Sequence, residues 1–200
     1  MPSARRHPPI VNEPMTVDEF VAWDDARGGK HPKYQLVDGE VRAMAPASTA
    51  HGTIQANLAR HLGNHLDKPG TRCHVVTEPA IETRVRAKLN MRIPDLGVSC
   101  LPGASGQIAL PDPILLIEIM SPGNKADTWG NVWAYTSIPS VREILIMQST
   151  RIEALLLRRQ TDGSWPADPE TIGPDAELAL TSIDFSMPLQ AAYKKTYLAA

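Results

Sequence analysis

The run Ile114-Leu115-Leu116-Ile117-Glu118-Ile119-Met120 lies between Pro113 and Pro122, and it decides the fold of this chain. Every residue of the run except Glu118 is apolar. So continuous a run is typical of a strand that is covered on both faces, at the centre of an α/β sheet. An ionised carboxylate inside such a strand costs several kcal/mol unless a cation meets it. Glu118 is therefore the first candidate functional residue.

A second acid, Asp95, lies in the strand-like segment Arg92-Ile93-Pro94-Asp95-Leu96-Gly97-Val98. Two carboxylates near the middles of neighbouring strands are usual oxygen ligands of Mg²⁺ or Mn²⁺. We expect such an ion between Asp95 and Glu118. Two alternatives stay open, because Glu118 could instead pair with Arg84 or Arg142, and Asp95 could serve only in a turn.

The composition favours one globular domain. The chain has 200 residues, 42% of them hydrophobic, and a net charge of -2. Its charge does not demand a nucleic-acid or membrane partner, so binding to a polyanion would need a local basic patch. No apolar stretch approaches the roughly 18 residues of a membrane-spanning helix. We expect a flexible N-terminal arm over residues 1–14, a single domain over 15–200, and a cytoplasmic location.

The two cysteines, Cys73 and Cys100, both lie in strand-like segments. Because nothing else in the chain is typical of a secreted protein, we expect them to act as small core residues. A disulfide between them is the less favoured alternative.

Turn signals and periodicity predict a mixed α/β order of elements. Thr16-Val17-Asp18-Glu19 has the pattern of a capping box, and Asp38-Gly39 separates two alternating segments as in a β-hairpin. Apolar residues at helical spacing predict a helix from about 48 to 66. The next elements are strands at about 71–78, 80–87, 92–100 and 113–120, followed by a helix over 127–137 with Asp127 as its N-cap. Two more strands fit 141–147 and 152–157, and a terminal helix is expected around 189–197. The first helix should end near Gly28-Gly29.

Three cationic residues, Arg84, Arg86 and Lys88, alternate with smaller residues and would share one face of the 80–87 strand. They could contact nucleic-acid phosphates, or they could form the solvated face of an antiparallel strand. His61 and His65 lie four apart on a helix, but no third zinc ligand accompanies them. His51 near the start of the same helix could reach the site or cap the core.

Several short sequence motifs, taken in their order along the chain, resemble those of the Uma2 family, also called DUF820. This family consists of restriction-endonuclease-like proteins of the PD-(D/E)xK superfamily. The resemblance extends from about residue 15 to about residue 158. The motifs are Tyr34-Gln35-Leu36-Val37-Asp38-Gly39-Glu40, Pro46-Ala47-Ser48 with His51, Pro94-Asp95-Leu96, Ile117-Glu118-Ile119-Met120-Ser121-Pro122, Asp127 and Tyr135.

The resemblance implies a restriction-endonuclease-like core with a mixed central β-sheet flanked by helices. It also implies a metal-dependent DNA endonuclease site and a homodimer. Asp95 and Glu118 match the family's metal-binding acids, and a backbone carbonyl from Ile119 would complete the protein ligands of Mg²⁺ or Mn²⁺. His51 and Asp127 would lie just outside those ligands.

Two positions depart from the family pattern. The family has an outer acid where this chain has Gln35. The lysine of the E-x-K word is Met120 here, and its migrated position on the following helix is Asn131, with Lys125 the only nearby replacement. Two carboxylates suffice to bind metal, but activating a water also needs acid–base help.

The sequence therefore predicts a metal-dependent endonuclease whose activity is impaired. The alternative is a non-catalytic pseudo-nuclease that binds DNA, RNA or a protein partner through the same cleft. A third possibility, an unrelated domain with Glu118 in a buried ion pair, predicts no metal.

Overall fold

The computed structural model describes residues 13–28 and 33–199. Most of the predicted arm, residues 1–12, lies outside the described residues, and so does Gly29. The first helix, α1 (Val17–Ala26), begins as predicted, since Thr16 is its N-cap and forms a complete capping box with Glu19.

A six-stranded mixed sheet is the centre of the fold, with β7 (Pro113–Met120) and β8 (Glu143–Gln148) as its parallel pair. All other neighbours in this sheet are antiparallel. The order is β10-β9-β8-β7-β6-β3, in which β6 (Leu96–Ser99) and β9 (Ala154–Arg158) flank the parallel pair and β3 (His74–Thr77) and β10 (Glu170–Ile172) are the edge strands. The mixed α/β sheet predicted from the apolar run is confirmed.

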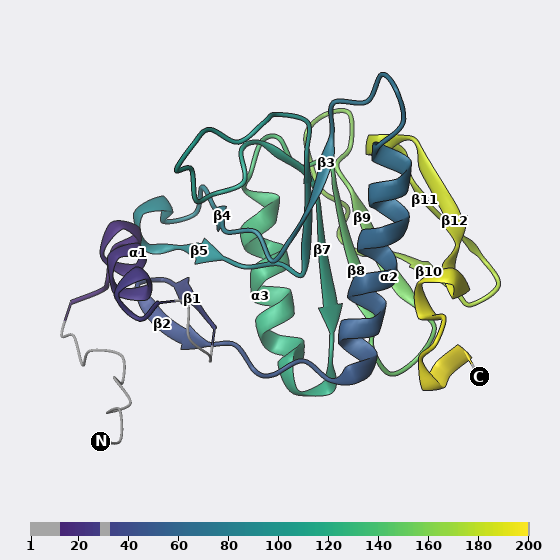
Figure 1. Cartoon of the computed structure of the whole chain (residues 1–200), viewed down its shortest axis with the longest axis horizontal. Coiled ribbons are helices and arrows are strands. Elements are labelled where there is room, and N and C mark those ends of the chain that lie inside the picture. The colour runs from purple at the N-terminus through teal and green to yellow at the C-terminus, as the bar shows by residue number, and fades with distance from the viewer. Residues whose placement is uncertain (1–12, 29–32, 200) are drawn as a thin grey trace.

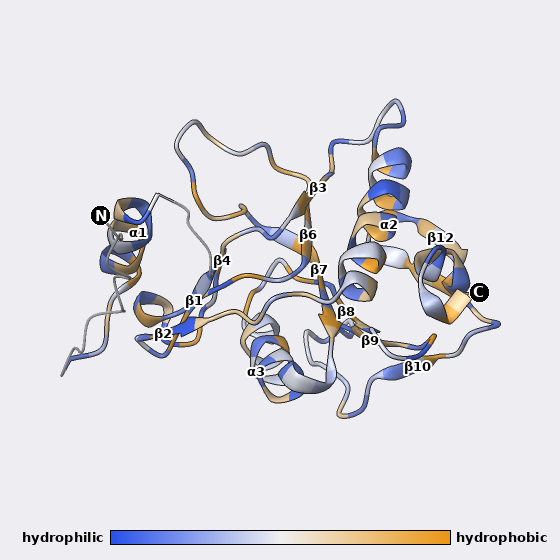
Figure 2. Ribbon diagram, turned by 60° about the horizontal axis from the view of Figure 1, so that its bottom comes forward, coloured by the Kyte–Doolittle hydropathy of each residue, from blue (hydrophilic) through white to orange (hydrophobic). Residues whose placement is uncertain are grey.

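Two helices cover opposite faces of this sheet, α2 (Thr49–Leu66) on one side and α3 (Lys125–Thr136) on the other (Figure 1). Successive side chains of β7 divide between them. Ile117 and Ile119 belong to the apolar cluster under α2, whereas Leu116 and Met120 belong to the cluster under α3. Figure 2 shows the apolar β7 between the two helices. By the same alternation, the intervening Glu118 points toward α3.

A smaller sheet with the order β2-β1-β5-β4 lies beside the central one and carries α1. The predicted hairpin joins β1 (Tyr34–Val37) to β2 (Glu40–Ala43). Asp38 and Gly39 both have positive φ, 51° and 84°, as the two-residue hairpin turn requires. The other two strands of this sheet are β4 (Ile81–Glu82) and β5 (Met91–Arg92).

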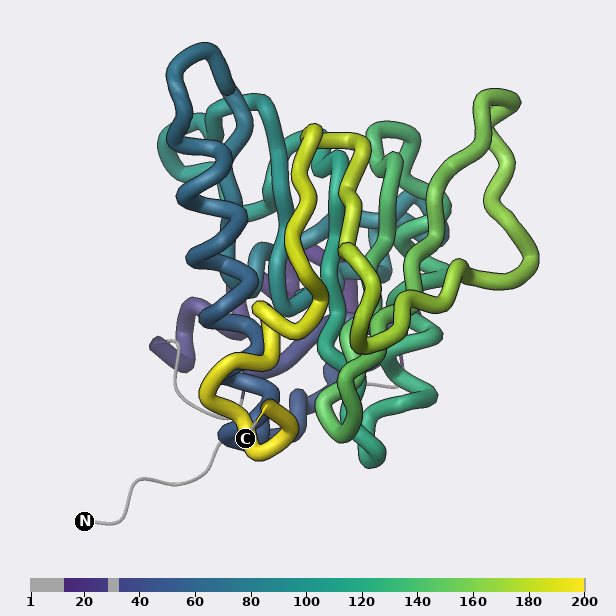
Figure 3. Tube along the Cα trace, turned by 90° about the vertical axis from the view of Figure 1, so that its right-hand side faces the viewer, coloured from purple at the N-terminus to yellow at the C-terminus, as the bar shows by residue number. Residues whose placement is uncertain are grey.

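The C-terminal segment forms a hairpin of β11 (Glu177–Leu180) and β12 (Phe185–Pro188), which the sequence does not predict. It packs beside α2 on the same face of the central sheet (Figure 3). The terminal helix predicted around 189–197 is wrong. The chain instead forms two short 3₁₀ helices, Leu189–Tyr193 and Tyr197–Ala199.

The predicted strand over 80–87 is wrong. Only Ile81–Glu82 is a strand, and the chain then turns into the 3₁₀ helix Ala87–Leu89, with Arg86 in the left-handed region at φ 44°. The predicted strand over 92–100 divides into β5 and β6, and Asp95 lies in the bend between them rather than in mid-strand. Helix α3 starts at Lys125 after the 3₁₀ helix Pro122–Asn124, so Asp127 is not its N-cap.

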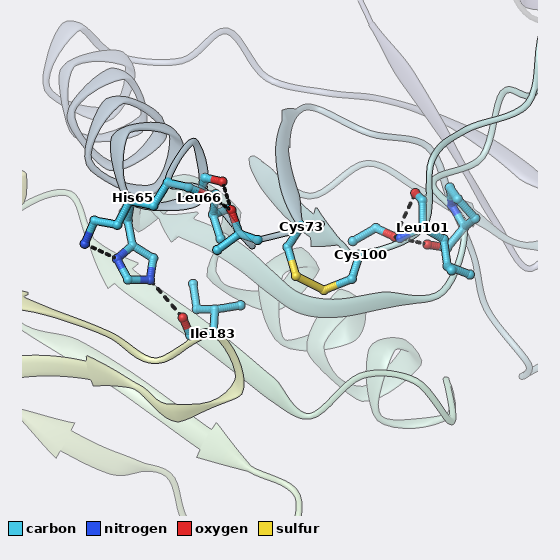
Figure 4. Close-up of a disulfide and its surroundings, with 10 residues drawn as sticks. His65, Leu66, Cys73, Cys100, Leu101 and Ile183 are labelled. Atoms are coloured by element: carbon cyan, nitrogen blue, oxygen red, sulfur yellow. Dashed lines mark hydrogen bonds between the residues drawn. A yellow bond between two sulfur atoms is a disulfide. The ribbon is translucent and has the colours of Figure 1, made fainter.

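The expectation of two unpaired cysteines is also wrong, because Cys73 and Cys100 form a disulfide (Figure 4). His74 pairs with Ser99 in the β3–β6 ladder. The antiparallel register therefore brings Cys73, one residue before β3, next to Cys100, one residue after β6. Among the described residues, no helix is long and apolar enough to cross a membrane.

Candidate functional site

A cavity of about 690 Å³ lies where the small sheet meets the central sheet and the first turns of α2 and α3. Its wall includes Asp95 and Glu118, the two acids singled out by sequence, together with Gln35, His51 and Asn131. Strand β1 supplies Gln35, and α2 and α3 supply His51 and Asn131. Elements far apart in the chain therefore bring the predicted residues to one place.

Each carboxylate oxygen of Asp95 has a hydrogen-bond partner. Its Oδ2 accepts a hydrogen bond of 2.6 Å from the backbone N–H of Ile119, and its Oδ1 lies 2.7 Å from Nε2 of His51. Gln55 of α2 donates to the Asp95 backbone carbonyl at 2.9 Å. Asp95 is thus fixed between β7 and α2, and the orientation of its carboxylate is set by His51 of the cavity wall and by the backbone of β7.

Glu118 is 5% exposed and faces α3, as the alternation along β7 requires. Its Oε1 accepts two hydrogen bonds, one of 2.8 Å from the hydroxyl of Tyr135 and one of 3.1 Å from Nδ2 of Asn131. The ion pair with Arg84 or Arg142 that the sequence left open is not formed among the described residues, and both arginines are exposed. The carboxylate is held by neutral donors.

Burial and the charge of Asp95 raise the pKa of Glu118 to about 8. Desolvation is the larger cause, and the donors Tyr135 and Asn131 offset only part of it. The Tyr135 hydroxyl is buried beside Glu118, so its own pKa is raised well above the ordinary value and it stays a donor. A cation at the cavity would relieve the repulsion between Asp95 and Glu118.

Behind Asn131 lies a buried arginine. Arg92 on β5 is 7% exposed, and it donates from Nη1 to Oδ1 of Asn131 at 3.0 Å and from Nη2 to Oδ1 of Asn90 at 2.9 Å. Burial lowers the pKa of Arg92, while the nearby Tyr135, Asp38 and Glu118 favour its charged form. Arg92, Asn131 and Glu118 form one continuous chain of hydrogen bonds.

The donor set fits a hard divalent cation. The Gln35 Oε1 atom is buried and has no hydrogen-bond partner within residues 13–28 and 33–199, and Gln35 lines the same cavity as Asp95 and Glu118. Among the described residues, the wall has four carboxylic acids, Glu78, Asp95, Glu118 and Asp127, against the permanently cationic Lys33 and Arg42 and the imidazole of His51. Two carboxylates and an amide oxygen, with water completing the shell, are ligands that suit Mg²⁺ or Mn²⁺. No group of three or more His, Cys, Asp or Glu residues in the described part of the chain could hold a metal by itself.

Several predicted residues do not line this cavity. Lys125 is exposed at the start of α3, and Met120 is buried in the apolar cluster under that helix. Arg84, Arg86 and Lys88 are exposed and do not form the predicted strand face. His65 contacts the backbone carbonyl of Ile183, on the far side of α2, rather than a metal partner.

Three basic residues at the site were missed by sequence reasoning. Lys33 lines the cavity and forms an ion pair with Glu78. Arg42 lines it too, with Nη2 3.0 Å from Oε2 of Glu40 and Nη1 3.9 Å from Oδ1 of Asp127. Arg92 lies just behind the wall. Of these, only Arg92 carried a usable signal, since it lies two residues before Pro94-Asp95 in a strand-like segment.

The comparisons with known proteins agree with this architecture. The sequence model of Uma2, described as "Putative restriction endonuclease", matches residues 17–189. The chain belongs to the Uma2 family. It is 28% identical over 162 residues to "Uncharacterized protein slr1290" of Synechocystis sp., covering 80% of this chain and 82% of that protein.

A solved structure shares the fold. The crystal structure of a "putative nuclease belonging to DUF820" from Anabaena variabilis superposes with a TM-score of 0.72, covering 90% of this chain and 98% of that one. Its sequence identity is 18%, so the likeness is one of fold. This Uma2 protein therefore has a nuclease-like α/β fold with a central mixed sheet flanked by helices.

Proposed function

We propose that this Uma2 protein is a metal-dependent endonuclease that hydrolyses DNA phosphodiester bonds at the Asp95–Glu118 cavity. The observation that carries the proposal is a pair of acids, each oriented by hydrogen bonds, that line one cavity together with Gln35, whose Oε1 has no partner among the described residues. A buried site with this excess of negative charge is suited to a divalent cation. Membership of a family described as "Putative restriction endonuclease" supports the same chemistry.

Asp95, Glu118 and Gln35 would hold the ion, and the backbone carbonyl of Ile119 stays the expected fourth protein ligand. A bound Mg²⁺ or Mn²⁺ would supply Lewis acidity toward the phosphate and lower the pKa of a coordinated water. The chain's own residues set the geometry around it. His51 and the Ile119 N–H orient Asp95, and Tyr135 and Asn131 orient Glu118.

Lys33 and Arg42 are the basic residues of the cavity wall, and both are exposed. We assign them contacts to DNA phosphates on either side of the bond to be cleaved. Because acids outnumber these two residues around the cavity, DNA should enter it only after a divalent ion has bound. Asp127, which lies 3.9 Å from Arg42, would orient that arginine.

A non-catalytic role is the second candidate, and one observation favours it. At the position of the migrated family lysine, Asn131 donates to Glu118 and accepts from Arg92, so it cannot remove a proton from water. A pseudo-nuclease of this kind would bind metal and DNA or RNA without turnover. The expected homodimer and cytoplasmic location stay predictions.

The test is cleavage of supercoiled plasmid DNA, with RNA as a second substrate, in Mg²⁺ or Mn²⁺ and in EDTA. Metal-dependent nicking that both Asp95→Asn and Glu118→Gln abolish is the expected result. The matched control is Glu177→Gln, which neutralises an exposed acid of β11 outside the cavity. Metal and DNA binding without cleavage would favour the pseudo-nuclease, and activity that survives in both acid variants would refute the proposed site.

A further inference from the structure

Arg92 is a buried cation with no carboxylate partner among the described residues. Its Nη1 and Nη2 groups donate to Asn131 and Asn90, two neutral amides, and its Nε–H is buried without an acceptor in the described part of the chain. An arginine in a protein keeps its charge, so burying one without an ion-pair partner is costly, even though the nearby Asp38 and Glu118 favour the charged form. A positive charge retained at such a cost, one residue behind the cavity wall, needs an explanation.

The guanidinium also decides which way the Asn131 amide points. Arginine has only donors, so it must face Oδ1 of Asn131 and not Nδ2. The Nδ2 group is thereby turned toward Glu118, whose Oε1 accepts one of its two N–H bonds at 3.1 Å. The second N–H has no partner among the described residues, and Asn131 lines the cavity. Asn131 can therefore only donate to what occupies the cavity.

We propose that Arg92 is a positioning residue of this site: it locks Asn131 as a donor toward the cavity and supplies, through that amide, the positive charge that a phosphodiester under attack requires. The inference rests on the proposed function. Negative charge that builds up on phosphate oxygens is stabilised best by donors fixed beforehand. Polarisation of the Asn131 amide by the guanidinium strengthens the hydrogen bond that it donates.

The lock, meaning the orientation of the Asn131 amide that Arg92 imposes, is tested without any substrate. In ¹⁵N-labelled protein, the side-chain NH₂ signals of Asn131 are assigned by their absence in Asn131→Ala, and the N–H that is bonded to Glu118 should be slow to exchange with solvent. Arg92→Met should shift them and speed their exchange, and Arg92→Lys, which keeps one donor and the charge, should do so less. Arg151→Met removes an exposed arginine outside the cavity and serves as the control. Unchanged Asn131 signals in folded Arg92→Met would overturn the lock.

The functional part is tested by kinetics in Mg²⁺. Arg92→Met should lower kcat for DNA cleavage by about 10- to 100-fold with little change in KM, since removing one direct transition-state donor costs about 10²- to 10³-fold and Arg92 acts through a second residue. A residue that only supports the fold would change neither constant well below its melting temperature. Partial recovery of kcat in Arg92→Lys is expected, and equal kcat in Arg92→Met and the parent would overturn the positioning role.

The sharpest test moves the positive charge from residue 92 to residue 131 by substitution. Asn131→Lys alone would place an ammonium against the buried guanidinium, so it should destabilise the fold and not raise kcat. In the Arg92→Met background the same change brings back one positive charge, and kcat should rise above that of Arg92→Met. Additive losses in the double variant would refute the charge role.

If the parent does not cleave DNA, the proposed function fails while the lock can still stand. The readout is then the affinity for a DNA duplex in Ca²⁺, which Arg92→Met should weaken and Arg151→Met should not. Equal affinity of all three proteins would overturn the inference in that case too.

Discussion

The backbone N–H of Ile119 donates a 2.6 Å hydrogen bond to Oδ2 of Asp95. This bond ties the bend before β6 to the residue that follows Glu118 on β7. The distance between the two acids is therefore set by the backbone of adjacent strands rather than by flexible side chains. Repulsion between them is built into the fold, and its relief by a cation is the basis of the predictions that follow.

The metal-free protein should lose stability as the pH rises. The pKa of Glu118 is about 8 in the folded protein against an ordinary value of 4.5. Between these values the folded state holds a proton that the unfolded state has released, so the free energy of unfolding falls as pH rises from about 4.5 to 8. Urea unfolding in EDTA across this range should show the fall in the parent and a much flatter curve in Glu118→Gln. Identical slopes would mean that Glu118 ionises normally.

Removing the Tyr135 hydroxyl should weaken metal binding more than it weakens the fold. Tyr135→Phe deletes the 2.8 Å donor to Glu118 but keeps the ring in the cluster under α3. Loss of such an outer contact typically costs about 10- to 100-fold in metal affinity. Calorimetry with Mn²⁺ measures the affinity. Tyr193→Phe, which removes a buried hydroxyl of a residue that does not line the cavity, is the control, and equal Mn²⁺ affinity in both variants would contradict the prediction.

Lys33 and Arg42 should contribute more to DNA binding than the predicted strip Arg84, Arg86 and Lys88. The first pair lines the cavity, whereas the strip lies on a turn and a 3₁₀ helix outside it. Each lost phosphate contact should flatten the salt dependence of binding by about one unit of slope in a plot of log K against log salt. Lys33→Ala with Arg42→Ala should thus change the slope by about two, and the triple strip variant by none. The reverse ranking would restore the strip as the contact surface.

The disulfide should stabilise the domain without touching the site. Closing a loop of 27 residues between Cys73 and Cys100 constrains the unfolded chain by about 3 to 4 kcal/mol in the loop-entropy model. Cys73→Ser with Cys100→Ser should therefore unfold at lower urea concentration, and Mn²⁺ affinity should stay that of the parent. A loss of metal binding in the folded variant would show that the disulfide also holds the site in shape.

The sequence predicts those parts of the fold and site that depend on local pattern. The apolar run around Glu118 identifies the central strand, and the Asp38-Gly39 signal identifies the hairpin, because each depends on neighbouring residues alone. The strand over 80–87 fails because alternating charges also suit a surface turn. The disulfide and the contact between Arg92 and Asn131 depend on strand register and on packing between distant elements, which no local pattern contains.

The same distinction explains the departures at Gln35 and Asn131. Their positions in the chain identify them as neighbours of the two acids, and the structure places both at the cavity. Their surroundings could not be predicted, because they depend on how the small sheet packs against the central one. Gln35 lies on β1, and its Oε1 has no partner among the described residues; Arg92, which donates to Asn131, lies on β5.

The central claim is a divalent cation held between Asp95 and Glu118, and the most direct measurement is a crystal soaked in Mn²⁺ and examined for anomalous scattering. The account predicts one strong anomalous peak within coordination distance of a carboxylate oxygen of each acid and of Gln35 Oε1, absent from crystals of Glu118→Gln. A structure with Mn²⁺ bound elsewhere, or with no peak between these acids in crystals soaked above pH 8, would contradict it.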